Sequence, residues 1–500
     1  MLKRLIVAAI GCSAAGAAAA YDLNYGGTDY GTFTTRLLAM TILTAKDNGW
    51  DPNSGSSYSL MGKYQSPDWN GFKLTTAAYL NGDIFGATDF DAERPARGMF
   101  VADEGAQKGQ LTDINVTYRD KQLHAFAGRA PINTPLTKLT YNHVPNSYTA
   151  LIVGAKPIKG LDISLGQITQ MSFGSRAMTD WGFIGEGTGT GGASQQPNKR
   201  GLGQVKFFNL GQIALGPDAD DISGMTLASV TYGGLPHTTV GIWNAYIDDI
   251  ANELYAHVDA KVPLNGLKLD LGAQYLRQDD VGDGPAGIPG PVAVRENFGS
   301  GELDYNLYGL KAGLLGPKKK WSVHAFWNHS DGDTAFLNSF GADPAYTSSI
   351  FSRNAYRENV DAWGLRGRYM IMPGLVFMAA YFDYGKSDTV GVVPGLTQRA
   401  EPTSDAEEID LVLVWKPKQV KGLALKTFYA NRTSEYDGFV NPRSGAKADA
   451  TMSHWRLIAT YQFRGGMRVS GTASARRRQP GIALAWPTDR AAACFRPRAA

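Results

Sequence analysis

The sequence predicts an all-β protein, a transmembrane antiparallel β-barrel of 18 strands with long external loops. Three observations predict this fold. Apolar side chains alternate along many short segments, eight short turns recur at similar spacing, and residues 21–500 contain no run of about 18 apolar residues that could form a transmembrane helix.

The stretch from Glu408 to Tyr436 shows the alternation most clearly. Every second residue from 409 to 415 is large and apolar, a basic turn follows at 416–422, and alternation resumes at Leu423. Side chains of a strand point to opposite faces with period two, so this stretch is a predicted β-hairpin. A soluble sheet would bury the apolar face in a core, whereas a membrane barrel would turn it towards lipid. One hairpin alone leaves both arrangements open.

The first 20 residues predict a secretory signal peptide. Lys3 and Arg4 precede an apolar run and small residues that end at Ala20, which is the usual order of such a signal. Lipidation at Cys12 and an ordinary buried helix are the alternatives. Removal of residues 1–20 leaves Cys494 as the one cysteine, so no intramolecular disulfide is expected.

Composition and charge are typical of an exported β protein. The chain has 59 Gly, 23 Tyr, 21 Phe and 10 Trp, and its 49 basic residues nearly balance 46 acidic ones. This balance argues against nucleic-acid binding. No linker-like break divides residues 21–470, so they form one predicted barrel domain. Residues 471–500 are an irregular, Arg-rich tail that we expect to be disordered.

Short turns recur where a segment ends near Pro and the next one starts at or after Gly, as between Pro157 and Gly160. Pro lacks the N–H that a ladder needs, and Gly accepts positive φ. The predicted turns lie near residues 67, 120, 157, 217, 263, 317, 373 and 417.

These turns divide the domain into 18 strands, of which the region 223–262 is the least certain, because residues 237–246 could replace part of 223–233. The predicted strands are 31–43, 57–66, 71–81, 111–119, 121–129, 147–156, 161–171, 202–215, 223–233, 252–262, 266–277, 301–315, 320–329, 359–371, 374–386, 404–416, 421–434 and 452–464.

The faces of the strands favour lipid outside. In 359–371 the residues Trp363, Leu365 and Tyr369 alternate with Arg366 and Arg368. Trp and Tyr gather near strand ends, as expected for interfacial aromatic belts. A large soluble β-sandwich or solenoid is the alternative, but its two ends should carry similar connections, whereas here short turns alternate with long loops.

The sequence resembles the OprD-type outer-membrane porins. The resemblance is carried by residues 128–131 with 142–148, by Trp243 to Ile250, by residues 341–348, and by the hairpin described above with Arg456 to Ile458. It implies a homotrimer in the Gram-negative outer membrane, in contact with lipid and lipopolysaccharide and without a cofactor. It also implies passive diffusion of small hydrophilic solutes, with a bias to carboxylates such as amino acids, organic acids and small peptides. The chain departs from the family at its end, because an Arg-rich tail follows the last strand instead of a closing aromatic residue.

A pore selects solutes by the charges on its lumen, and the resemblance implies a ladder of basic residues with acidic groups opposite. Arg366 and Arg368 are two residues apart and should point the same way, about 7 Å apart. The predicted basic ladder is Arg36, Lys63, Arg129, Arg366, Arg368, Lys426, Arg432 and Arg456. The predicted acidic side is Asp113, Asp270, Asp304, Asp343, Glu408 and Asp410. The resemblance further implies an inward-folded constriction loop, residues 130–146, which includes Pro131, Pro135, His143 and Pro145.

Two other functions stay open. A general or sugar-type porin would use lumen aromatic residues such as Phe326 and Phe428. A barrel-anchored enzyme or adhesin is the other alternative. We find no Gly-x-Ser-x-Gly motif, and the separation of His324 and His329 places them on opposite faces of one strand, which is unsuitable for a shared metal. Neither catalytic nor metal-binding residues are expected.

Overall fold

The computed structural model describes residues 21–25, 28–46, 53–84, 108–137, 143–172, 207–215, 221–283, 303–334, 336–337, 340, 344–350, 359–386, 405–435 and 450–463. The predicted signal peptide, residues 1–20, and the predicted tail, residues 471–500, lie outside these ranges. Among the residues that the structure describes, no helix is long and apolar enough to cross a membrane.

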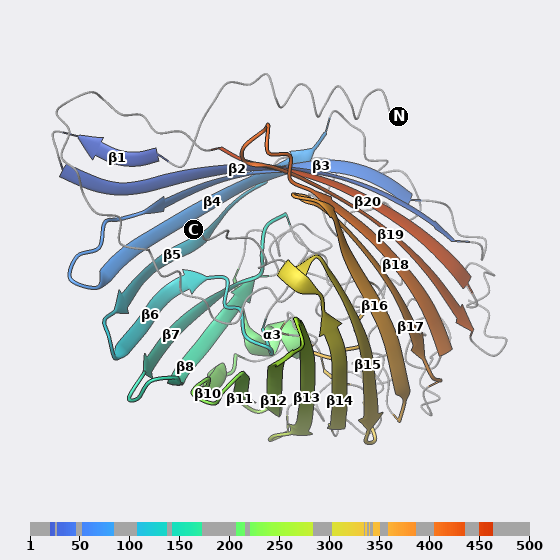
Figure 1. The fold of residues 1–500 in the computed structure, drawn as a ribbon. Coiled ribbons are helices and arrows are strands. Elements are labelled where there is room, and N and C mark those ends of the chain that lie inside the picture. Colours follow the sequence, from blue (N-terminus) through green and yellow to red (C-terminus); the bar gives the residue numbers. More distant parts are fainter. Residues whose placement is uncertain are drawn as a thin grey trace.

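The predicted 18-stranded barrel is confirmed. Every pairing is antiparallel, and the ring closes because β2 pairs with both β3 and β20 (Figure 1). Strands β1 and β9 lie outside the ring and pair only with β2 and β8. The strands are β1 (Tyr21–Tyr25), β2 (Thr28–Lys46), β3 (Asn53–Gln65), β4 (Phe72–Asp83), β5 (Lys108–Arg119), β6 (Leu123–Ala130), β7 (Ser147–Ala155), β8 (Leu161–Ser172), β9 (Phe208–Asn209), β10 (Met225–Tyr232), β11 (Thr238–Ile247), β12 (Ala251–Leu264), β13 (Leu267–Asp280), β14 (Asp304–Leu315), β15 (Trp321–Asp331), β16 (Asp361–Met372), β17 (Leu375–Tyr384), β18 (Asp405–Trp415), β19 (Leu423–Glu435) and β20 (Ala450–Gln462).

One predicted strand, 202–215, is wrong, and the turn predicted near residue 217 lies outside the described residues. Part of this segment is the helix α3 (Leu210–Leu215), and the missing strand is β11, which follows a turn at 233–237. Asn209 starts the helix, because its Oδ1 accepts hydrogen bonds from the backbone N–H of Gly211 and of Ile222. Leu210, Ile213 and Ala214 are buried at the three- and four-residue spacing of a helix face.

The two faces of the barrel wall are inverted relative to a soluble protein. On β16 the outward Trp363 has 49 % of its surface exposed, while the inward Ala362 has none. Outward-facing apolar side chains such as Leu151, Leu310 and Trp455 repeat this pattern around the ring. Such a band faces lipid in a transmembrane barrel, so the apolar face is outside, as the sequence predicts.

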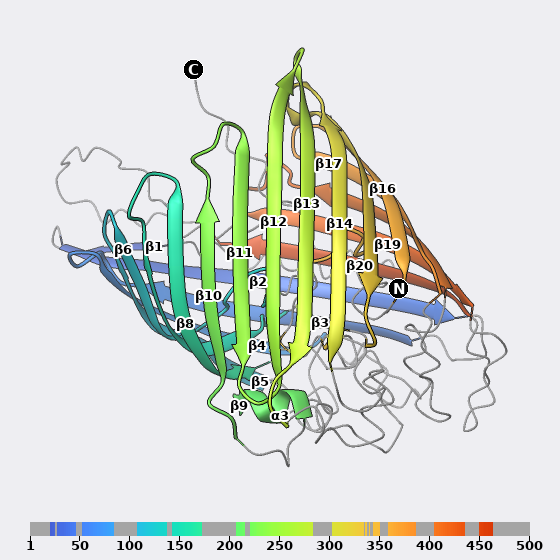
Figure 2. The ribbon, with the colours of Figure 1, turned by 90° about the horizontal axis from the view of Figure 1, so that it is seen from below.

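A hydrophobic cluster fills part of the interior. Helix α3 lies at the loop end of β10, β11 and β12 (Figure 2). Its Leu210 and Ile213 pack in one cluster with Leu136, which follows β6, and with Leu337 and Phe340, which follow β15. Segments from three different connections therefore meet inside the barrel, on the side formed by β6 to β14.

Candidate functional site: the charged lumen face

Five predicted basic residues gather on four adjacent strands and form what we call the basic wall. It consists of Lys426 and Arg432 on β19, Arg456 on β20, Arg36 on β2 and Lys63 on β3. The order β19, β20, β2, β3 runs across the seam where the two ends of the barrel sequence meet (Figure 1).

The inward orientation of the basic wall follows from the period of two. Arg456 is only 6 % exposed, whereas its neighbour Trp455 is 52 % exposed on the outer face. Arg456 lies opposite Phe428 on β19 and opposite Ile42 on β2, and both are buried on the inner face.

Three of these cations make cation–π contacts with aromatic rings. The guanidinium of Arg456 and the ammonium of Lys426 lie 4.9 Å and 5.4 Å from the ring centre of Phe428. The guanidinium of Arg36 lies 5.7 Å from the ring centre of Tyr79. A ring attracts a cation through its quadrupole and carries no net charge. These contacts therefore position the cations without cancelling their positive charge.

Acidic residues flank the basic wall on both sides. The Lys63 ammonium lies 3.5 Å from the carboxylate of Asp113 on β5, and Glu408 on β18 is the cross-strand partner of Arg432. Both carboxylates are buried and point inward. These acids thus neighbour the cations, whereas the resemblance implies acidic groups on the opposite side of the lumen.

Arg366 and Asp410 also face inward, but they contact an inward loop segment, residues 344–350. The Arg366 guanidinium lies 5.1 Å and 5.3 Å from the ring centres of Phe326 and Phe382, and it donates a hydrogen bond to the Ser348 carbonyl at 3.4 Å. The Asp410 carboxylate accepts a hydrogen bond from the backbone N–H of Ile350 at 3.1 Å. Both residues therefore help to hold this loop segment against the inner wall.

Arg368 and Arg129 do not join the basic wall. Arg368 shares the inward face with Arg366, as expected, but donates to the Lys319 carbonyl in the β14–β15 turn at 2.8 Å. Arg129 pairs with the outward-facing Ile114, and its guanidinium lies 4.3 Å from the ring centre of Phe207. The sequence pattern places Arg129 at the right strand end but on the wrong face, because the inward positions of β6 are even-numbered.

A second charged cluster occupies the inner face of β12, β13 and β14, and only Asp270 was among the predicted residues. The Lys311 ammonium lies 2.8 Å from the carboxylate of Asp259 and 3.5 Å from that of Asp270. Lys261 and His324 also approach Asp270, at 3.7 Å and 3.4 Å. The inward parity of β12 and β14 could have revealed Asp259 and Lys311. Charges in this cluster largely cancel.

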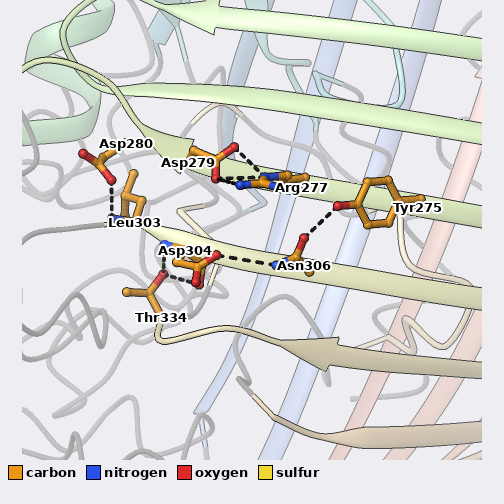
Figure 3. Close-up of polar contacts among 8 residues, drawn as sticks. All are labelled: Tyr275, Arg277, Asp279, Asp280, Leu303, Asp304, Asn306 and Thr334. Atoms are coloured by element: carbon orange, nitrogen blue, oxygen red, sulfur yellow. Dashed lines mark hydrogen bonds and ion pairs between the residues drawn. The ribbon is translucent and has the colours of Figure 1, made fainter.

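Asp304 lies on the outer face at the loop end of β14. Its backbone N–H donates to the Thr334 hydroxyl at 3.0 Å, and the Asn306 amide approaches its carboxylate at 3.5 Å (Figure 3). Arg277 and Asp279 form an ion pair of 2.7 Å beside it. Asp304 therefore does not line the lumen. Asp343 lies outside the described residues.

The described parts of the predicted constriction loop fold into the barrel. Pro131 and Pro135 flank buried Ile132 in the segment that follows β6. At the other end, just before Pro145, the His143 imidazole hydrogen-bonds to the Ser57 hydroxyl on β3.

The next residue, Val144, packs against Met61, Ala77 and Tyr79 on the inner wall of β3 and β4. Burial lowers the pKa of His143 to about 3, with smaller contributions from the positive charges of Arg456 and Arg36. His143 is therefore neutral at ordinary pH, and the loop reaches the basic wall.

Tyr148 at the start of β7 connects the two inward loops. Its hydroxyl lies 2.8 Å from the carbonyl of Thr137 and 2.6 Å from the carbonyl of Phe340. Nothing in the sequence pattern singles out this residue, because its role depends on which loops turn inward. Within the described segments, no group of three or more His, Cys, Asp or Glu could hold a metal ion.

Comparisons with known proteins agree with this geometry. The model of the OprD family of outer membrane porins matches residues 100–465. No match was found among curated proteins.

Solved structures show the same fold at low sequence identity. OccK8 (OprE) of Pseudomonas aeruginosa is 14 % identical, with a TM-score of 0.61 over 86 % of this chain and 98 % of that chain. OpdK of the same organism, solved with vanillate, is 12 % identical, with a TM-score of 0.59 over 86 % and 98 % of the two chains. OccAB4 of Acinetobacter baumannii is 12 % identical, with a TM-score of 0.62 over 86 % and 97 %. The chain belongs to the OprD family of outer membrane porins.

Proposed function

We propose that this outer-membrane porin favours small carboxylate-bearing solutes, such as amino acids, organic acids and small peptides, and that they pass along the basic wall. The observation that carries this proposal is the aromatic support of Arg456, Lys426 and Arg36, at 4.9–5.7 Å from ring centres. Cations held in this way keep a positive potential that a carboxylate can use.

The basic wall would replace part of the hydration shell of a carboxylate with hydrogen bonds from its cations. A carboxylate accepts hydrogen bonds from one cation after another, and each contact is weak enough to release it. Arg432 and Lys426 lie on one strand, and Arg456 lies beside them on the next. Arg456 pairs with Phe428 and therefore stands between Lys426 and Arg432 along the wall, so a solute would pass from one cation to the next.

We further propose that residues 130–146 narrow the channel beside the basic wall. The docking of His143 on Ser57 and of Val144 on the inner faces of β3 and β4 supports this role. Residues 344–350, which contact Arg366 and Asp410, would border the same path.

Solute specificity is tested by single-channel conductance of the refolded chain in planar bilayers, titrated with acetate, glutamate and benzoate and, separately, with glucose and sucrose. Concentration-dependent block by the carboxylates, and none by the sugars, is the expected result. The OpdK structure with vanillate, itself a carboxylate, is consistent with this choice of probes. Block by the sugars alone would instead identify a sugar-type porin.

The homotrimer that the resemblance implies also remains a proposal. The mass of the detergent-solubilised protein, measured by light scattering with the detergent contribution subtracted, would decide between one and three chains. No catalytic role is proposed, because the family and the barrel fold are those of a porin.

A further inference from the structure

The short turns of the barrel carry a strong positive charge. They comprise residues 66–71, 120–122, 156–160, 233–237, 265–266, 316–320, 373–374 and 416–422. Their charged residues are nine lysines and two aspartates, which gives a net charge of +7 in a chain whose net charge is only +3. We call the nine lysines the basic rim: Lys121, Lys156, Lys159, Lys318, Lys319, Lys320, Lys416, Lys418 and Lys421.

The two aspartates of the turns have local structural roles. The Asp120 carboxylate accepts the backbone N–H groups of Gln122 and Leu123 at 2.7 Å and 2.6 Å. The Asp68 carboxylate accepts the N–H of Gly71 at 2.8 Å. They therefore shape turns in the usual manner of Asx residues. Among the lysines, the Lys156 ammonium lies 3.3 Å from the carboxylate of Asp162, which is close to the start of β8.

Acidic side chains gather at the opposite end of the barrel. Outward-facing carboxylates occupy the loop ends of successive strands there, among them Asp279, Asp304, Asp331, Asp361, Asp383 and Glu407. Short turns face the periplasm in bacterial outer-membrane barrels, and long loops face outward. The basic rim therefore lies at the level of the inner leaflet, where phospholipid headgroups are found.

Exposed apolar side chains stand beside the lysines of the rim. Ile158 is 59 % exposed between Lys156 and Lys159, and Val420 is 40 % exposed between Lys418 and Lys421. The same turns therefore offer apolar surface to acyl chains and ammonium groups to headgroups.

One rim lysine shows how such a side chain lies on the lipid-facing surface. The Lys320 ammonium is 5.7 Å from the ring centre of Tyr369, which is exposed on the outer face of β16. The lysine is thus directed along the outside of the barrel wall. Lysines near an interfacial aromatic belt snorkel to the headgroup level.

We propose that the basic rim binds anionic phospholipids of the inner leaflet, with phosphate on the lysines and acyl chains on the apolar side chains of the same turns. Clusters of Lys and Arg at a membrane surface attract anionic lipid, and the attraction falls off within a Debye length. The binding fixes the depth of the turns in the leaflet.

The test uses Trp415, which is exposed on the outer face at the end of β18, next to Lys416. The whole barrel is reconstituted in vesicles of phosphatidylcholine that contain increasing fractions of brominated phosphatidylglycerol or brominated phosphatidylcholine. Bromine quenches Trp fluorescence on contact. The signal of a Trp415→Phe variant is subtracted to remove the other tryptophans.

The measured quantity is the ratio of Trp415 quenching by brominated phosphatidylglycerol to quenching by brominated phosphatidylcholine. We expect this ratio to be about three or more at low salt and to fall in 0.5 M salt. Replacement of Lys318, Lys319, Lys320, Lys416, Lys418 and Lys421 by Gln should reduce the ratio to about one. The matched control replaces the six outward carboxylates named above by their amides and should keep the preference.

Heat-modified gel mobility shows that each variant has a folded barrel. Equal quenching by both lipids in the unchanged protein would overturn the proposal, and so would an undiminished preference in the six-lysine variant. The proposal would also fall if the lysines mattered only for retention on isolated peptidoglycan sacculi, because the partner would then be a carboxylate polymer and not a lipid.

Discussion

At the scale of single residues, the basic wall depends on aromatic neighbours as much as on charges. Phe428 lies on the inner face of β19, opposite Arg456 and two residues from Lys426, and it is almost fully buried. One ring therefore positions two cations. Its burial also explains why we favour a carboxylate path over a sugar path, since its face is already occupied by the two cations.

Replacing Phe428 by Leu should weaken carboxylate block several-fold and leave the net charge unchanged. A cation–π contact is worth about 0.5–2 kcal/mol, and its loss frees both cations from their positions. Block by benzoate in single-channel recordings measures the effect. Phe326→Leu, which removes a ring beneath Arg366, is the matched control and should change block less. Equal block by the Phe428 variant and the unchanged protein would argue against aromatic positioning.

The backbone conformation of Gly128 leads to a prediction about the stability of the barrel. Its φ is +120°, and an added Cβ would lie 2.2 Å from the Ile114 carbonyl oxygen. Gly128→Ala should therefore destabilise the barrel by about 1–3 kcal/mol, measured by urea unfolding in detergent micelles. Gly233→Ala, where a Cβ would meet no atom within 4 Å, should be nearly neutral. A larger loss at Gly233 than at Gly128 would contradict this explanation.

At the scale of elements, periodicity predicts strands well and inward segments poorly. The alternation in β16 correctly places Arg366 and Arg368 on the inner face, because one side chain in two must face lipid. The segment that contains α3 is apolar enough to be mistaken for a strand, and only the spacing of Leu210, Ile213 and Ala214 distinguishes it. Loop contacts depend on tertiary packing, so no local pattern predicts them.

In the candidate site, too, the positions of strand residues can be predicted from the sequence, whereas contacts with loops cannot. Strand parity places most of the basic wall correctly, and it would also have found Lys311. The contact between Asp410 and Ile350 could not have been predicted, because the two residues are far apart in sequence and are joined by a loop folded inward. The partners of a charged residue decide whether it selects solutes or supports a loop.

The predicted constriction loop should respond to acid through His143. Its pKa is about 3 in the docked state and about 6.5 when the imidazole is released into water. Between these values the released state binds more protons, so docking is strongest above about pH 6.5 and weakens as the pH falls towards 3. Channel conductance should therefore become less stable at pH 4 than at pH 7.

The His143→Gln substitution keeps a side chain that can hydrogen-bond to Ser57 but does not titrate. The conductance of this variant should therefore differ less between pH 4 and pH 7 than the conductance of the unchanged protein. His237→Gln changes an exposed histidine in the β10–β11 turn and should behave like the unchanged protein. If the conductance of the His143→Gln variant still changed between pH 7 and pH 4, other titratable groups would be responsible for the acid response.

At the scale of the whole molecule, charge is divided along and around the barrel. The basic rim lies at the short-turn end and outward carboxylates lie at the loop end. Around the inner face, the five cations of the basic wall on β19, β20, β2 and β3 lie beside two acids, Asp113 and Glu408. Lys311 and Lys261 lie beside an equal number of acids, Asp259 and Asp270. The central claim of the proposed function is that an anion inside the barrel is attracted mainly to the basic wall.

The most direct test of this claim is the reversal potential of single channels in a potassium chloride gradient. Replacing Arg456 and Lys426 by Gln should lower the chloride-to-potassium permeability ratio by about threefold or more, because loss of two fixed charges changes ion free energies by on the order of 1 kcal/mol. Replacing Lys318 and Lys320 by Gln removes the same charge from the basic rim and should change the ratio little. An unchanged ratio in the Arg456 and Lys426 variant, with conductance intact, would contradict the account.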